Sequence, residues 1–194
     1  MIPDIRTKIR ALIQDTPKPD FQIFAYSNSN VFKLAEPNIE EVTQVLVNGV
    51  LLGSGQSFDF VEDSNEVTIS GVSFNVDDLI EVRYTFTKYS DSELTEYIRA
   101  SLSWANVFEV GDDDFEIDEP SDDIFPSLSK TESNLIALVA SILICPDYTS
   151  YKLPNLSVSY PVQMPKDERI VKLITRFRHG IGTSDVVQWG DWGF

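Results

Sequence analysis

The sequence predicts an α+β protein in which a small antiparallel β-roll or sandwich module is combined with a helical bundle. Residues 41–86 contain short runs of alternating apolar residues separated by Asn, Asp and Gly, which is typical of antiparallel strands and tight turns. Two Ser-x-x-Glu capping boxes, Ser90–Glu93 and Ser129–Glu132, stand before apolar stretches with helical spacing. With 194 residues, 42% of them hydrophobic, the chain is long enough to bury a core.

Residues 1–20 are predicted to contain an N-terminal helix that packs with the bundle. Asp4 is in a position to cap this helix, and Pro17 and Pro19 end it because proline cannot continue a helix. The apolar residues recur at helical spacing on one face, formed by Ile5, Ile9, Leu12 and Ile13.

Residues 21–89 are predicted to form the antiparallel β module. Residues 21–26 and 31–34 favour strands on either side of a turn. Asn48-Gly49 suits a two-residue hairpin turn, since both central positions of this turn need a positive φ. Ile80–Phe86 alternates with period two, and the module is expected to end near Lys88–Ser92.

Residues 90–180 are predicted to form the helical bundle, interrupted by an acidic loop at 111–123. One helix follows each capping box, and Ser133–Cys145 is the most apolar of them. Residues 149–165 favour an extended segment with three prolines, and a last helix follows Pro165. Residues 181–194 are expected to form an extended C-terminal tail.

Composition restricts the possible functions. A net charge of −16 argues against wrapping nucleic acid and against docking on anionic lipid. No run approaches the roughly 18 apolar residues of a membrane span. Cys145 and His179 are the only residues of their kinds, so an intrachain disulfide and a metal site of several Cys or several His are excluded. No nucleophile motif, phosphate-binding loop or dinucleotide fingerprint occurs, and we expect no enzyme activity and no cofactor.

Charge is unevenly distributed along the chain. Residues 90–150 carry 2 basic and 14 acidic side chains, whereas residues 151–194 carry 6 and 4. An acidic middle beside a basic end favours complementary surfaces, either within one subunit or between neighbouring subunits.

Asp112, Asp113 and Asp114 open the acidic loop, which allows three interpretations. It can be a solvated loop, a calcium site, or a surface that binds a basic helix of a neighbouring subunit. Calcium needs six to eight oxygen ligands. Ile117 stands where an EF-hand loop needs glycine, and no well-placed Glu closes the site, so we expect no metal.

Two other groups are candidate interaction residues. Basic side chains recur at spacings of three and four along one side of the last helix, at Lys166, Arg169, Lys172 and Arg176. They form either a solvated face or an intersubunit contact, for which the acidic loop is a possible partner. Trp189 and Trp192 in the tail either bind a pocket of a partner or fold back onto their own domain.

The β module resembles the hairpin modules of tailed-bacteriophage virion proteins. The pattern V-x-V-N-G-x-L-L, F-x-F, N-x-V-x-I, D-D-x-I-x-V-x-Y in Glu41–Phe86 carries this resemblance, together with the step TFTKYSDSELTEYIRASL from a strand into a capped helix. It covers about a quarter of the chain. The resemblance is architectural, so no site residue is carried over.

This resemblance implies a structural virion protein of the head–tail connector or neck, of the adaptor type. Such proteins form homo-oligomeric rings, commonly twelvefold, between the portal protein and the tail. The implied partners are further copies, portal and tail or neck proteins, and DNA that passes without specific binding. Synthesis in the host bacterial cytoplasm and location in the virion, without a membrane, are also implied.

An alternative is a phage fibre, decoration or tail protein whose β module binds a receptor or a carbohydrate. Tyr and Trp side chains could stack on sugar rings. The helical half does not favour this alternative, because receptor-binding tips are usually mostly β. Fibre proteins are usually trimers, whereas connectors form larger rings.

Overall fold

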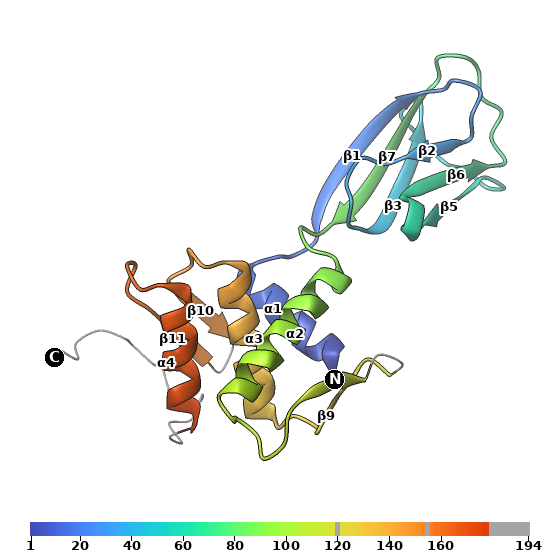
Figure 1. Ribbon diagram of the computed structural model, residues 1–194. Coiled ribbons are helices and arrows are strands. Elements are labelled where there is room, and N and C mark those ends of the chain that lie inside the picture. The colour runs from blue at the N-terminus through green and yellow to red at the C-terminus, as the bar shows by residue number, and fades with distance from the viewer. Residues whose placement is uncertain (119–120, 154–155, 179–194) are drawn as a thin grey trace. The chain divides into compact units, whose positions relative to one another are not determined.

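The computed structural model describes residues 1–118, 121–153 and 156–178 and confirms the α+β class (Figure 1). The chain forms two compact units. The β unit is Thr16–Tyr89, and the helical unit combines Met1–Asp15 with the chain from Ser90 onward. The helical unit is therefore assembled from two segments that the whole β unit separates in sequence. No helix in the described part of the chain is long and apolar enough to cross a membrane.

The β unit consists of two antiparallel sheets. The four-stranded sheet has the order β1 (Lys18–Ala25), β7 (Leu79–Phe86), β3 (Ile39–Val47) and β4 (Val50–Leu51). The three-stranded sheet has the order β2 (Val31–Lys33), β6 (Glu66–Ser70) and β5 (Ser57–Val61), and the short helix η1 (Glu62–Ser64) joins β5 to β6. Strands β1 and β2, which flank the predicted turn, belong to different sheets.

Alternating side chains fill the space between these sheets. Val45 and Val82 are paired neighbours on β3 and β7, and both are buried in a cluster that also contains Val67 and Ile69 of β6. The predicted tight turn is confirmed, because Asn48 and Gly49 have φ values of 51° and 79° between the paired residues of β3 and β4.

In the part of the chain that the structure describes, the helical unit contains four helices and two short hairpins. Helix α3 (Lys130–Ile144) contacts the other three, which are α1 (Ile2–Ile13), α2 (Asp91–Val107) and α4 (Lys166–Arg178). One hairpin is formed by β8 (Glu116–Asp118) and β9 (Asp123–Phe125), and the other by β10 (Ser150–Leu153) and β11 (Leu156–Ser159). Most of α3 is buried, as its apolar sequence predicts, because it is surrounded by other helices.

The local signals that start α2 and α3 are confirmed. The hydroxyl of Ser90 accepts the Glu93 N–H at 3.1 Å, and the Glu93 carboxylate accepts the Ser90 N–H at 2.7 Å. Ser129 and Glu132 form the same reciprocal pair before α3. Each box satisfies two backbone donors that a helix start leaves without partners.

Two predictions need correction. Helix α1 begins at Ile2 with Met1 as its cap residue, and Asp4 lies within the first turn, where it forms an ion pair with Lys8 at 2.8 Å. The acidic segment 111–123 is a loop only in part, because its second half forms the β8–β9 hairpin.

Candidate interaction site

The acidic segment is attached firmly to helix α2. The Asn106 side chain binds both backbone groups of Phe115, donating to its carbonyl at 3.0 Å and accepting its N–H at 2.9 Å. The Phe115 side chain is buried, and so is Ile124 on the opposing strand. A Cβ at Gly111 would lie 2.8 Å from the Phe115 ring, so only glycine fits there without displacement. The backbone that carries the acidic side chains is therefore held in place.

Several carboxylates of this segment remain exposed and uncompensated. Asp112, Asp113 and Asp114 are all exposed. The following acidic residues form no ion pair with any described residue: Asp112, Asp113, Asp114, Glu116 and Asp118. The sequence between Arg99 and Lys130 contains no Lys or Arg. These carboxylates repel one another, and a basic surface would relieve that repulsion.

The remaining carboxylates of the hairpin connect it to α1. Asp122 accepts Arg6 Nη2 at 3.0 Å, and Asp123 binds the amino group of Met1 at 2.9 Å. Arg6 also donates to Thr95 of α2 at 2.7 Å. A single arginine therefore ties helix α1 to helix α2 and to the hairpin.

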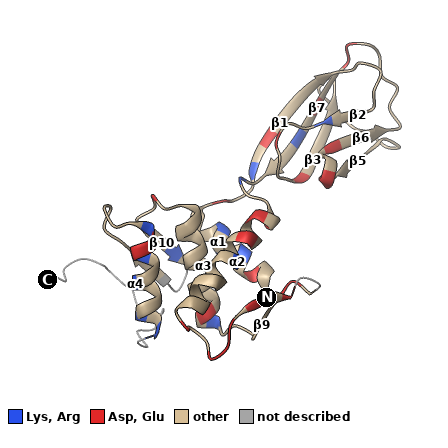
Figure 2. Ribbon diagram, viewed as in Figure 1, with Lys and Arg blue, Asp and Glu red and all other residues tan. Residues whose placement is uncertain are grey.

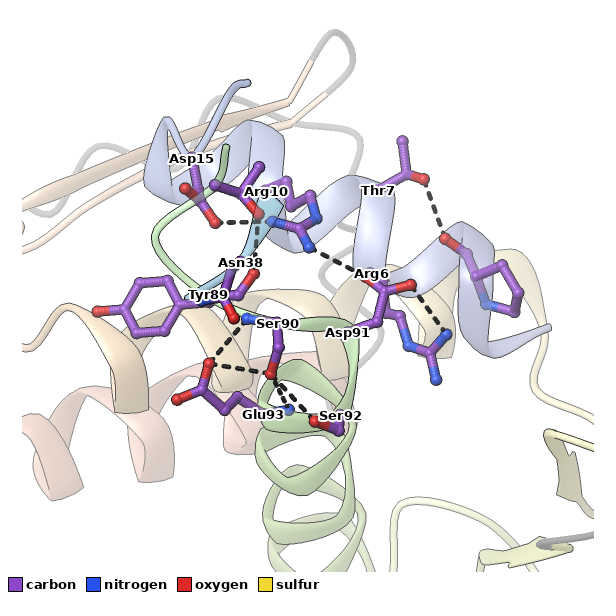
Figure 3. A network of polar contacts seen from close by, with 12 residues as sticks. Arg6, Thr7, Arg10, Asp15, Asn38, Tyr89, Ser90, Asp91, Ser92 and Glu93 are labelled. Atoms are coloured by element: carbon purple, nitrogen blue, oxygen red, sulfur yellow. Dashed lines mark hydrogen bonds and ion pairs between the residues drawn. The ribbon is translucent and has the colours of Figure 1, made fainter. Parts of the chain in front are cut away.

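A second polar cluster holds the two sequence segments of the helical unit together (Figure 3). Arg10 binds Asp15 at 2.8 Å and Asp91 at 3.0 Å, and Arg6 also reaches Asp91 at 3.3 Å. Asp91 lies in the first turn of α2, where a carboxylate also favours the helix dipole. These two arginines are engaged inside the unit, so its exposed basic residues must come from elsewhere.

The four basic residues predicted on the last helix differ in their exposure and in their partners. Lys166 is exposed in the first turn of α4, beside Asp167 and Glu168. Lys172 binds Glu168 at 2.9 Å and is partly exposed, as is Arg176. The expectation for Arg169 is wrong, because its side chain lies in the interior and only 3% of the residue is exposed.

Arg169 holds two loops together rather than facing a neighbour. It donates to four backbone carbonyls, from Nε to Met164 (2.7 Å), from Nη1 to Pro146 and Tyr148 (2.8 Å each), and from Nη2 to Val162 (3.4 Å). Its guanidinium also lies over the Tyr160 ring, with Cζ 5.8 Å from the ring centre. Burial raises the pKa of Tyr160 and of Tyr151, and the positive charge of Arg169 opposes both shifts. The segments before β10 and before α4 are therefore fixed by one cation.

Within the helical unit, basic side chains recur along α4, whose first turn also carries Asp167 and Glu168, and acidic side chains predominate on the segment before the β8–β9 hairpin. Figure 2 shows blue residues on α4 and red residues along the segment that leads into the β8–β9 hairpin. Among the described residues, the two regions approach each other where Arg178 of α4 lies 3.8 Å from Glu109. Such a distribution allows the basic residues of α4 in one copy to bind the acidic segment of another.

The other candidate residues were metal, thiol and tail positions, and the described ones form no metal site. No group of three His, Cys, Asp or Glu among the described residues is placed to hold a metal ion. Cys145 caps the C-terminus of α3, and its carbonyl accepts the Tyr151 hydroxyl at 2.6 Å. His179, Trp189 and Trp192 lie outside the described residues.

The β unit contains a separate groove of about 420 Å³ between β3, β4 and β5. Its polar lining comes from Thr43, Gln44, Gln56 and Ser57, and Leu51 and Phe58 supply apolar surface. No described residue that lines it is charged. The side-chain oxygen Oε1 of Gln56 accepts the Gly53 N–H at 2.7 Å, which leaves the side-chain nitrogen Nε2 of Gln56 as a donor.

The turn of the β3–β4 hairpin is fixed by a second loop. Asn48 donates to the Asp78 carboxylate at 2.9 Å and accepts the Leu79 N–H at 2.9 Å. The hydrogen bond from Asn48 lowers the pKa of Asp78 below its usual value, and the Asn75 N–H adds to the effect. The short strand β4, which borders the groove, is thereby held at its turn.

Comparison with known proteins identifies no relative. No protein-family model matches the chain, and the search of curated proteins gives no match either.

Proposed function

We propose that this chain is a structural protein of a tailed-phage virion that assembles into a homo-oligomeric ring in the head–tail connector or neck. In this role it joins the portal to the tail and surrounds the DNA passage. The observation that supports the proposal is the separation of charge in the helical unit. Five carboxylates that pair with no described basic residue lie on one firmly held segment, and the basic residues Lys166, Lys172 and Arg176 lie on a different element, α4.

A contact between two different surfaces repeats from copy to copy. Head-to-tail contacts of this kind close into rings when the rotation between copies allows it, and form filaments when it does not. The net charge of −16 also suits the wall of a channel through which DNA passes without adhering. These two properties favour the connector over a monomeric enzyme or a nucleic-acid-binding protein.

The contact is tested by charge reversal. The Asp113→Lys/Asp114→Lys variant and the Lys166→Glu/Lys172→Glu variant should each associate at least about tenfold more weakly, since each replaces part of the attraction between the two surfaces by repulsion. Wild-type association should also weaken as salt rises from about 0.05 M to about 0.5 M, because the screening length falls below about 10 Å. Light scattering across this salt series measures both effects.

A control variant separates the contact from net charge alone. Glu62→Lys/Asp63→Lys changes two exposed residues of the β unit and shifts the net charge by the same four units as the acidic-segment variant. It should associate like the wild type. If it loses association as strongly as Asp113→Lys/Asp114→Lys, the acidic segment is not the contact. A wild-type trimer that resists salt would favour the fibre or decoration alternative.

A second candidate function is supported by the groove in the β unit. Its uncharged amide and hydroxyl groups beside apolar surface suit a neutral sugar, and its volume lies within the usual range of ligand sites, about 300–1,000 Å³. This function would make the chain a receptor- or carbohydrate-binding virion protein. The predominantly acidic β unit would disfavour anionic glycans.

Glycan binding is measured by NMR titration with neutral oligosaccharides. Binding should shift the side-chain amide signals of Gln44 and Gln56, and Gln56→Ala should weaken it at least about fivefold, since a buried polar ligand group would lose its partner. Gln163→Ala, an exposed amide in the helical unit, is the control. Absence of shifts with every neutral oligosaccharide, or equal effects of the two variants, would contradict this function.

A further inference from the structure

The outer face of the four-stranded sheet is unusually apolar. Strand residues alternate between the two faces of a sheet, and an outer face that meets water is normally polar. Here four large apolar residues of the outer face are more than half exposed, at 56% for Phe21, 52% for Ile23, 53% for Leu79 and 55% for Leu51. Their neighbours on the inner face, such as Ile80 and Val82, are fully buried.

The strand register places these side chains on one surface. Ile23, Glu81, Leu46 and Leu51 lie side by side across β1, β7, β3 and β4. Phe21, Arg83 and the polar Gln44 occupy the next row, and Ala25 and Leu79 lie on the other side of Ile23 and Glu81. The result is an apolar surface with one acidic and one basic residue near its centre, joined by an ion pair of 2.6 Å. Contiguous exposed apolar surface of this kind commonly marks an interaction site.

The open edge of this sheet is less suited to binding than the face. Among the described strands, β1 pairs with β7 alone, so one of its edges has no described partner. Pro19 has no N–H, and the Asp20 carboxylate accepts the Phe21 N–H at 2.8 Å. Both features block the addition of another strand along the first half of β1. Contact through the face itself is therefore favoured.

We propose that this face binds the same face of a second copy of the chain around a two-fold axis. The charges favour a second copy as the partner. A two-fold axis that passes between Glu81 and Arg83 places Glu81 of each copy opposite Arg83 of the other. The face is balanced in charge at its centre, whereas the outer face of the other sheet has an excess of one acidic residue, because it carries Asp59 and Glu66 with Lys33. Two copies can therefore meet here without the repulsion that their acidic units would otherwise cause.

This contact goes beyond the proposed function and is independent of it, because it uses apolar surface of the β unit rather than the charged surfaces of the helical unit. Salt should weaken the charged contact of the helical unit but should not weaken this one, because salt does not screen the burial of apolar surface. A two-fold contact pairs copies, so any closed assembly that uses it contains an even number of them.

Analytical ultracentrifugation of the full chain at high salt tests the proposal. We expect a dimer under conditions that screen the helical contact. Phe21→Thr/Ile23→Thr should raise the dimer dissociation constant at least about tenfold, because buried aromatic and aliphatic anchors usually dominate an interface. Threonine also retains a high strand propensity at these exposed positions. Val31→Thr/Val61→Thr, which changes two exposed apolar residues of the other sheet, should leave the dimer unchanged.

Charge exchange tests the two-fold geometry. Glu81→Arg alone should dissociate the dimer, because two basic residues would then face two others. Combining Glu81→Arg with Arg83→Glu should restore it, since the exchanged pair is again self-complementary. A wild-type monomer at high salt, an unchanged dimer in Phe21→Thr/Ile23→Thr, or no restoration by the charge exchange would each overturn the proposal. None of these results depends on the charge-reversal outcome for the helical unit.

Discussion

Replacing Arg169 with methionine is expected to destabilise the helical unit by about 3 kcal/mol. The methionine retains much of the apolar stem but removes every donor, so four carbonyls in two loops lose their shared partner. An unsatisfied buried carbonyl costs about 1–3 kcal/mol, and the loss of the buried charge offsets part of the sum. Arg169→Lys keeps the charge without the planar fork and should lose about half as much.

Tryptophan fluorescence during urea unfolding measures this loss of stability in the helical unit specifically. All three tryptophans lie at or after Trp104, so none is in the β unit. Lys172→Met, a partly exposed position on the same helix, is the control and should change stability by less than about 0.5 kcal/mol. An Arg169→Met variant as stable as this control would contradict the role assigned to the buried guanidinium.

Replacing Gly71 with alanine is expected to destabilise the β unit by about 3 kcal/mol. Gly71 has a φ of 76°, where an L-residue costs about 1–2 kcal/mol. The new Cβ would also lie 2.3 Å from the Gly55 carbonyl oxygen, so the loop must move, at a cost of about 1–3 kcal/mol. That loop leads into the groove between β3 and β5, so its shape would change as well.

Gly49 provides a matched control for this variant. Its φ is 79°, but nothing lies within 4 Å of the position that a Cβ would occupy. Gly49→Ala should therefore cost only the conformational term, about 1 kcal/mol. Hydrogen exchange of the β6 and β7 amides compares the two variants within the β unit. Equal losses would show that the contact with the Gly55 carbonyl has no energetic importance.

Features determined by neighbouring residues could be predicted from sequence. Ser90 with Glu93 and Asn48 with Gly49 form within four residues or fewer, and each uses a specific backbone geometry. The buried face of α1 also follows from residue spacing alone. In each case the information that decides the structure lies within one turn of helix or one hairpin.

Features determined by distant segments could not be predicted. Arg169 and the partly exposed Lys172 belong to the same series of basic residues, which recur at spacings of three and four along α4. Arg169 is buried because two loops pack around its side chain. The β8–β9 hairpin was missed because its strands have three residues each and are rich in Asp and Glu, which have low strand propensity. Asn106 gave no signal, because its partner Phe115 lies nine residues away.

The apolar outer face has a signal in the sequence of β1. Ile23 and Phe24 are consecutive, and consecutive strand residues point to opposite faces, so β1 must present apolar groups on both. A strand with one solvated face would have a polar residue at one of these two positions.

The central claim is that opposite charges on the helical unit hold copies together, and mixing two variants tests it most directly. Asp113→Lys/Asp114→Lys adds lysines to the acidic segment and leaves α4 unchanged, whereas Lys166→Glu/Lys172→Glu adds glutamates to α4 and leaves the acidic segment unchanged. Neither variant should associate through this contact alone, whereas an equimolar mixture should form an alternating assembly whose mass approaches that of the wild type at low salt. A mixture that remains as dissociated as its two components would contradict the claim.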